Sequence, residues 1–158
     1  PEIWPHEAKE AGAFIVGTGR GDFPNQINNS VCFPGILKGA LLVRAKKISD
    51  GMAIRCSHSI ADYSEKKGIN PDNIVVTMED EDVFAQEAAD VAMQAIKEGL
   101  NRVTITWEEA YNKAKAEIKQ CRTLTKTLMK EGFIKEPPKE MYEEALKYAV
   151  EQIKKNRK

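Results

Sequence analysis

The chain has 158 residues, and its 24 Lys and Arg residues balance 24 Asp and Glu residues. The zero net charge gives no electrostatic reason to expect nucleic acid or an anionic membrane as a partner. No apolar run is long enough to span a bilayer, no secretory signal is visible, and the three cysteines have no CxxC or metal-ligand spacing, so we expect a cytoplasmic protein with reduced thiols.

The first third of the chain predicts a helix, a strand and a second helix. Residues 5–10 indicate a short helix, and residues 13–16 (Ala-Phe-Ile-Val) are typical of a short buried strand. Residues 36–44 indicate the second helix. A polar loop, residues 18–35, therefore leaves a strand and enters a helix, which is where ligands bind in open α/β sheets.

The composition of this loop favours a binding site. Glycines allow close backbone approach to a ligand. Neutral amides both donate and accept hydrogen bonds, so they suit a polar organic substrate or a carboxylate. The amides are Asn25, Gln26, Asn28 and Asn29. The alternative is that the loop is only a turn, because Asn often bonds to nearby backbone.

The rest of the chain is mainly helical in pattern. Apolar spacing predicts a helix that Ser49 or Asp50 caps and Gly68 ends, followed by a strand at residues 73–77. The acidic run 79–82 is interpreted as the start of the next helix rather than a metal site, since four adjacent side chains cannot converge on one cation. A capping box at Thr106 opens a long helix to about residue 130, and the last helix covers 139–155.

Several motifs resemble the malic enzymes, most closely the shorter malate oxidoreductases of bacteria and archaea. The resemblance is dense over about the first 45 residues. The family usually has Ser at the position of Gly21. The motifs are Pro1-Glu2-Ile3, Thr18-Gly19-Arg20, Asp22-Phe23-Pro24-Asn25-Gln26, Asn28-Asn29 and Phe33-Pro34-Gly35.

The resemblance implies an α/β fold: the C-terminal part of a Rossmann-like NAD(P)-binding domain over residues 1–105, followed by an α-helical extension over residues 106–158. The family's catalytic Tyr and Lys, its acidic metal ligands and its dinucleotide glycine fingerprint are not found in this sequence. We therefore expect no catalytic and no metal-binding residues here, and an incomplete, inactive fragment of an enzyme.

The resemblance also implies a reaction and a site. The reaction is the oxidative decarboxylation of malate to pyruvate and CO2 with NAD or NADP, and Mg²⁺ or Mn²⁺ would be held by upstream ligands. Asn28 and Asn29 would bind substrate, and Thr18, Gly19 and Asn28 would bind cofactor. Expected partners are malate and pyruvate, the remainder of the enzyme, and a second copy in a homodimer. The alternative is a non-catalytic ligand-binding or assembly module derived from the same fold.

Overall fold

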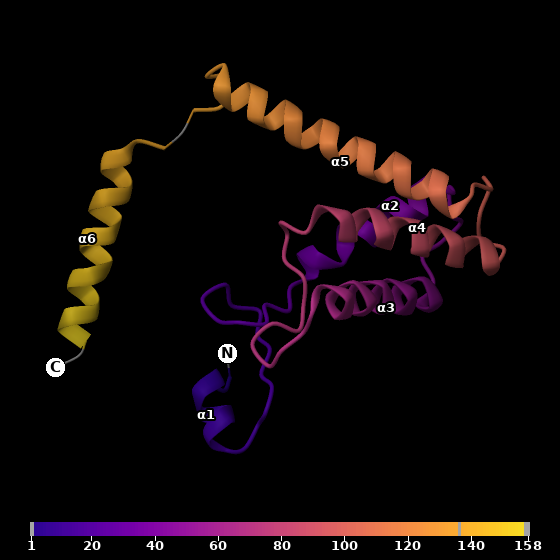
Figure 1. The fold of residues 1–158 in the computed structure, drawn as a ribbon. Helices are drawn as coiled ribbons and strands as arrows, with labels where there is room; N and C mark the ends of the chain where they lie inside the picture. Colours follow the sequence, from indigo (N-terminus) through magenta and orange to yellow (C-terminus); the bar gives the residue numbers. More distant parts are fainter. Residues whose placement is uncertain (1, 136, 157–158) are drawn as a thin grey trace. The chain divides into compact units, whose positions relative to one another are not determined.

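The computed structural model describes residues 2–135 and 137–156, and helices dominate them (Figure 1). The chain divides into two compact units, residues 1–119 and 120–158. The elements in chain order are α1 (Pro5–Glu10), the 3-10 turn η1 (Asn29–Val31), α2 (Phe33–Leu42), α3 (Asp50–Lys67), α4 (Glu81–Lys97), α5 (Trp107–Lys130) and α6 (Lys139–Asn156).

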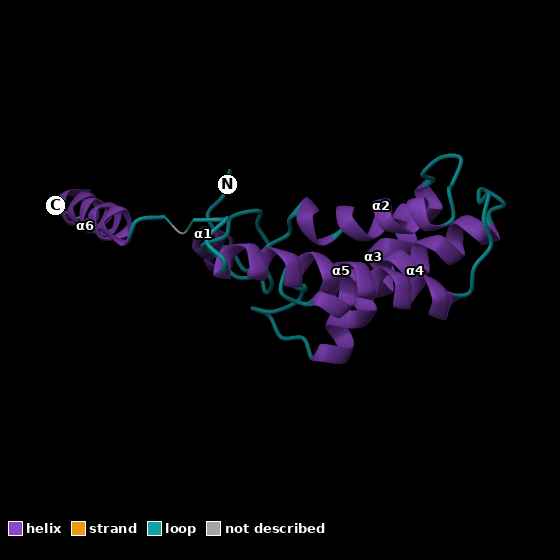
Figure 2. Cartoon of the chain, turned by 90° about the horizontal axis from the view of Figure 1, so that it is seen from above, coloured by secondary structure: helices purple, strands orange, loops and turns teal. Residues whose placement is uncertain are grey.

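The α/β fold predicted from the sequence is wrong. The described residues contain no strand (Figure 2) and only two isolated bridges, Thr18 to Gln26 and Asn70 to Asn73. The predicted strand at residues 13–16 is irregular, and Phe14 and Ile15 are 78% and 44% exposed. The segment at residues 73–77 is extended but forms no ladder. A short apolar run fits several structures, and only hydrogen bonding to a neighbour makes it a strand.

The helix predictions agree closely with the structure because their capping signals are local. The Ser49 hydroxyl accepts the Met52 N–H at the start of α3, and Gly68 follows its end with φ +97°. At α5, Thr106 Oγ1 accepts the Glu109 N–H at 3.1 Å, while Glu109 Oε2 accepts the Thr106 N–H at 2.8 Å. The predicted capping box is therefore confirmed.

Helix α4 forms the centre of the first unit, where it packs against α2 and α3 (Figure 1). Its buried face is rich in alanine, so there is little side-chain volume between the helices. Glycines on α2 complete the close approach: a Cβ at Gly39 would lie 2.7 Å from the Ala88 carbonyl oxygen. The buried alanines of α4 are Ala85, Ala88, Ala89, Ala92 and Ala95.

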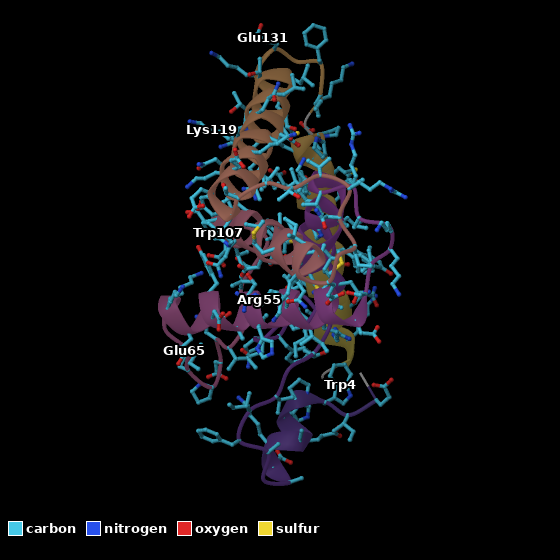
Figure 3. The ribbon with its side chains drawn as sticks, turned by 90° about the vertical axis from the view of Figure 1, so that its right-hand side faces the viewer. Trp4, Arg55, Glu65, Trp107, Lys119 and Glu131 are labelled. Carbon is cyan, nitrogen blue, oxygen red and sulfur yellow. The ribbon has the colours of Figure 1, made fainter. Side chains whose placement is uncertain are left out.

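The first turns of α5 also belong to this unit. Ala110 and Ala114 are fully buried. Asp90 of α4 accepts one hydrogen bond from Trp107 Nε1 at 2.9 Å and another from Arg55 Nη2 of α3 at 2.8 Å. Figure 3 labels Arg55 and Trp107 on their helices. The mostly buried Asp90 carboxylate thus has a partner on each of two neighbouring elements, as a buried charge requires.

The second unit contains the end of α5 and all of α6. Gly132, with φ +77°, follows α5. None of its residues whose burial is described, 120–135 and 137–155, is buried. Large apolar side chains on α6 are exposed, among them Met141, Leu146, Tyr148 and Ile153. Within the described part of the chain, no helix is both long and apolar enough to cross a membrane.

Candidate ligand-binding site

Two loops that are far apart in the sequence build the candidate site, residues 16–31 and residues 70–80. The first loop folds back on itself through a parallel bridge. The Thr18 N–H donates to the Asn25 carbonyl at 3.1 Å, and the Ile27 N–H donates to the Thr18 carbonyl at 2.9 Å. This bridge fixes the path of the amide-rich segment that follows.

Asn25 joins the two loops. Its side chain is buried, and its amide nitrogen donates to the carbonyls of Val16 at 3.1 Å and Pro71 at 2.8 Å. Its amide oxygen accepts the Ile74 N–H at 2.9 Å. The residue has φ +55°, a conformation that Asn tolerates better than most residues. Asn25 therefore has a structural role, but its bonds to Pro71 and Ile74 are long-range and differ from the local backbone bonds of the turn alternative.

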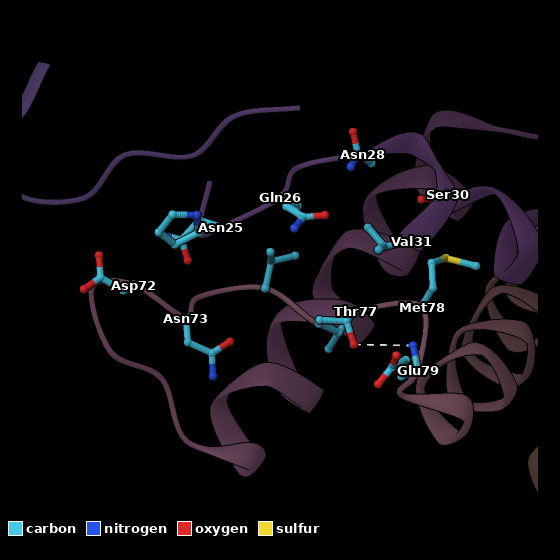
Figure 4. A pocket seen from close by; sticks show the side chains of 13 residues that line it. Asn25, Gln26, Asn28, Ser30, Val31, Asp72, Asn73, Thr77, Met78 and Glu79 are labelled. Carbon is cyan, nitrogen blue, oxygen red and sulfur yellow. Dashed lines mark hydrogen bonds between the residues drawn. The ribbon is translucent and has the colours of Figure 1, made fainter. Parts of the chain in front are cut away.

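A pocket of about 510 Å³ lies between the two loops (Figure 4). Gln26 and Asn28 line it on one side, and Asn73 and Thr77 line it on the other. Val31, Val75 and Val76 add apolar surface. The walls therefore present neutral donors and acceptors next to apolar surface, a combination suited to a small polar organic ligand.

Two carboxylates, those of Asp72 and Glu79, also line this pocket, and Asp72 forms an ion pair with Lys9 at 3.0 Å. Glu79 lines the pocket and is exposed. Burial alone would raise the pKa of the neighbouring Asp80. The hydrogen bond from Lys67 Nζ at 2.7 Å, together with the Thr77 N–H at 2.9 Å, more than offsets burial and holds that pKa below its usual value. Asp80 is thus an ionised carboxylate that anchors the loop just before α4.

A second pocket, of about 620 Å³, lies beside the N-terminal segment and is lined by residues that include Ile3, Val16, Thr18, Gly19 and Arg20. Arg20 forms an ion pair with Asp22 at 2.6 Å. This hydrogen bond lowers the pKa of Asp22. The pair neutralises Arg20, and Glu2 adds a carboxyl group to the lining of the pocket.

The site residues predicted from the sequence do not all line one pocket. Asn28 lines the first pocket, and Thr18 and Gly19 line the second. A Cβ at Gly19 would lie 3.4 Å from Asn28 Oδ1, so Gly19 and Asn28 are neighbours. Asn29 begins η1, is exposed and is not part of either lining.

Sequence reasoning missed the second wall of the first pocket. Asn73 and Thr77 were interpreted as parts of a strand, and Glu79 as part of a helix start. The Asn70-Pro71-Asp72-Asn73 run is a turn signal that could have indicated a loop. No local pattern indicates that this turn lies opposite Asn28, because that proximity comes from the tertiary fold.

The described residues contain no group of three or more His, Cys, Asp or Glu side chains placed to hold a metal ion. The acidic run at residues 79–82 illustrates why. Asp80 forms an ion pair with Lys67, and Asp82 forms one with Lys115. The two carboxylates therefore pair with separate lysines instead of converging on one point.

Comparison with known proteins identifies the class to which this fold and pocket belong. The family described as "malic enzyme, NAD binding domain" matches residues 15–98, which is more than half of the chain. The chain belongs to the malic enzyme family. The matched region contains both loops of the candidate site and helices α2, α3 and α4. The residues of the second pocket that precede residue 15, such as Ile3, lie outside it.

Solved structures and a curated relative agree with this assignment. The crystal structure of the malic enzyme of Entamoeba histolytica is 57% identical with a TM-score of 0.93, over 97% of this chain and 32% of that one. The malic enzyme of Pyrococcus horikoshii is 42% identical with a TM-score of 0.78, over 83% of this chain and 30% of that one. The bifunctional malic/malolactic enzyme of Bacillus subtilis is 43% identical over 115 residues, 73% of this chain and 28% of the relative.

The chain thus spans about a third or less of the length of these relatives. Other curated relatives are named as NAD-dependent and NADP-dependent malic enzymes.

Proposed function

We propose that this chain acts as part of a malic enzyme, which oxidatively decarboxylates malate to pyruvate and CO2 and reduces NAD or NADP. The likeness to a malic enzyme over nearly the whole chain carries the proposal. Family membership and the amide-lined pocket support it. Because the chain covers only part of its relatives, the activity belongs to the larger enzyme.

In this proposal Asn28 contributes binding and orientation. Its half-buried amide lines the first pocket and can donate a hydrogen bond to a carboxylate or to the carboxamide of a nicotinamide. Asn29, the next residue, is assigned to substrate, and Thr18 and Gly19 to cofactor. NAD or NADP would supply the hydride acceptor.

The fit of a dinucleotide to these residues rests on the loop geometry. Gly19 has no side chain beside the Asn28 amide, so a ligand can approach the backbone there. Thr18 and Gly19 face a second pocket that adjoins this point. The two pockets therefore offer neighbouring places for the two ends of a polar ligand.

A divalent metal does not fit the side chains of this chain, because the described residues offer no cluster of ligands. We assign Mg²⁺ or Mn²⁺ binding, and the acid and base groups, to the remainder of the enzyme. In this proposal, the residues of the two pockets hold and orient the substrate, and they exclude water from around it.

We also propose that the enzyme is cytoplasmic and self-associates as a homodimer. The exposed apolar side chains of α6, from Met141 to Ile153, support self-association, because a run of such residues along one helix is costly to leave in water. Free cysteines are typical of a reducing compartment and support the location.

A hybrid enzyme tests the catalytic proposal. Residues 1–158 replace the matching segment of the Entamoeba histolytica enzyme, and malate-dependent reduction of NAD and of NADP is measured. We expect the hybrid to turn over malate and the isolated chain to reduce neither cofactor. A folded hybrid without activity would favour the alternative, a non-catalytic binding or assembly module.

Point variants of the hybrid then test the site. Asn28→Ala and Asn29→Ala should each lower kcat/KM by about tenfold or more, since a hydrogen bond to a charged group is worth about 1.5–3 kcal/mol. Asn112→Ala is the matched control, because Asn112 is an exposed amide on α5 outside both pockets. Equal kinetics for Asn28→Ala and the control would refute the role of Asn28.

A further inference from the structure

Two cysteines from different elements meet beside a buried carboxyl group. Cys32 lies between η1 and α2, and Cys56 lies on α3. Their Sγ atoms are 3.6 Å apart. The Cys56 thiol also lies 3.6 Å from Oε2 of Glu87, which projects from α4. Three separate segments of the first unit therefore converge on one small cluster.

Glu87 is unusual in this cluster because its carboxyl group is fully buried yet only partly hydrogen-bonded. It is 0% exposed, and its second oxygen, Oε1, has no hydrogen-bond partner. Gly35 of α2 packs directly against the carboxyl group, where any Cβ would overlap it. An apolar residue would be the ordinary occupant of such a place, since burying a carboxyl group without full hydrogen bonding is costly.

We propose that Cys32 and Cys56 form a reversible disulfide when the protein meets a hydroperoxide, and that Glu87 acts as the base for the closing step. The geometry needs only a small movement. A disulfide has an S–S bond of about 2.05 Å, so the two sulfurs must approach each other by about 1.5 Å. Cys32 lies at the junction between η1 and α2, so part of this approach can come from rotation of its side chain.

The two thiols differ in a way that sets the order of events. Cys32 is partly exposed, whereas Cys56 is fully buried. Burial, reinforced by the nearby Glu87, raises the pKa of the Cys56 thiol strongly, so it does not ionise by itself. Burial also raises the pKa of Glu87 to about 8, which brings its basicity closer to that of a thiol. Cys32 is therefore the thiol that meets the oxidant, and Cys56 is the thiol that needs a base.

The chemistry balances in two steps. The Cys32 sulfur attacks one peroxide oxygen, the O–O bond breaks, and the Cys32 proton leaves with the other oxygen as water, or as the corresponding alcohol. Cys32 is now a sulfenic acid. Glu87 serves as the base in its ionised form, which grows as the pH approaches 8: Cys56 gives its proton to the Glu87 carboxylate while its sulfur attacks the Cys32 sulfur. The S–S bond forms, the S–O bond breaks, and Glu87 returns the proton to the departing hydroxide as water.

The new bond would act on the first pocket. Val31, the residue before Cys32, lines that pocket, and Asn28 lies at the N-terminal side of the same turn. A bond from Cys32 to α3 would tether this turn to a helix that lines no part of the pocket. Oxidation would therefore restrict the movement of the turn that carries Asn28.

The test uses the full chain carrying Cys121→Ser, which removes the exposed third thiol. The protein is treated with hydrogen peroxide, and peptides are mapped by mass spectrometry. We expect the loss of two hydrogen atoms and a peptide pair joining Cys32 to Cys56, both reversed by a thiol reductant. Absence of that peptide pair in protein with an unchanged circular dichroism spectrum would overturn the proposal.

Variants assign the roles of the three residues. Cys56→Ser should leave a Cys32 sulfenic acid that dimedone traps, whereas Cys32→Ser should form no dimedone adduct. Glu87→Gln keeps the shape of the side chain but removes the base, so the closing step should slow by about tenfold or more. In the Glu87→Gln variant the rate of the first step, the oxidation of Cys32 measured as peroxide consumption, should be unchanged. Glu108→Gln, on the exposed start of α5, is the matched control. Equal closing rates for the two glutamine variants would refute the role of Glu87.

Discussion

The side-chain oxygen of Asn25 accepts the backbone N–H of Ile74 at 2.9 Å, a contact between residues 49 positions apart. The same side chain donates to two carbonyls, so one amide satisfies three backbone groups of two loops. Since these loops form opposite walls of the first pocket, the shape of the pocket depends on Asn25 without Asn25 needing to touch a ligand.

Replacement of Asn25 by alanine should destabilise the protein by about 2–4 kcal/mol, because three partly buried backbone groups lose their partner. The positive φ adds strain for alanine. The measurement is urea unfolding followed by circular dichroism. Asn29→Ala, at an exposed amide in the same loop, should change stability by less than about 0.5 kcal/mol. A similar effect of both variants would contradict the structural role of Asn25.

Glu87 should make stability fall as the pH rises. Burial raises the pKa of its carboxyl group from 4.5 to about 8 in the folded protein. The folded state therefore holds the proton more tightly than the unfolded state. The stabilisation is complete below pH 4.5 and is lost as the pH rises through about 8. The contribution of this group is at most about 5 kcal/mol.

Glu87→Gln should remove that dependence, because the amide does not titrate. Urea unfolding at about pH 5 and about pH 9 provides the comparison. The wild-type protein should lose more stability between the two values than the variant. Parallel losses would mean that Glu87 has the same pKa in the folded and unfolded states. Glu108→Gln controls for the loss of one surface charge.

The capping box at the start of α5 gives a smaller effect. Thr106→Ala removes the acceptor for the Glu109 N–H and should cost about 1 kcal/mol. Thr127→Ala, within the same helix, removes only a bond to the Thr123 carbonyl and should be nearly neutral, because alanine favours the helix. Thermal unfolding checks both variants. An effect of Thr127→Ala as large as that of Thr106→Ala would contradict a specific role for the cap.

Removal of residues 120–158 tests self-association. Ala110 and Ala114 are buried in the first unit, so a truncation after Lys119 leaves that core complete. We expect the truncated protein to stay helical and to be monomeric, while the full chain forms dimers, as measured by light scattering. A monomeric full chain, or dimers formed equally by both proteins, would show that α6 does not drive association.

Helices were predictable because their signals are local. The capping signals at Ser49, Gly68 and Thr106 each depend only on residues within four positions. The structure confirms the helix ends that they mark. The strand predictions at residues 13–16 and 73–77 are wrong, since a segment becomes a strand only by pairing with a neighbour. Phe14 is exposed, and the N–H of Ile74 is taken by a side chain rather than by another strand.

The candidate site was predictable only in part. The amide-rich loop was found, but both Asn25 and Asn28 line the first pocket, and the sequence cannot show that only Asn25 also bonds to Pro71 and Ile74 across the two loops. That difference depends on the tertiary position of Pro71 and Ile74. The pairing of Cys32 with Cys56 has no local pattern either, because the two residues are 24 positions apart on separate elements. The binding roles of Thr18, Gly19, Asn28 and Asn29 stay predictions.

The contact between α2 and α4 has a mechanical consequence. At Gly39 the two helices meet nearly backbone to backbone, with a carbonyl oxygen where a side chain would otherwise stand. A long side chain between two helices can accommodate a shift by changing rotamer, but the atoms that face Gly39 belong to the Ala88 carbonyl and to the short, β-branched side chain of Val91. We therefore expect α2 and α4 to move together at this point, so that a shift of the turn that carries Asn28 also reaches the helix that carries Glu87.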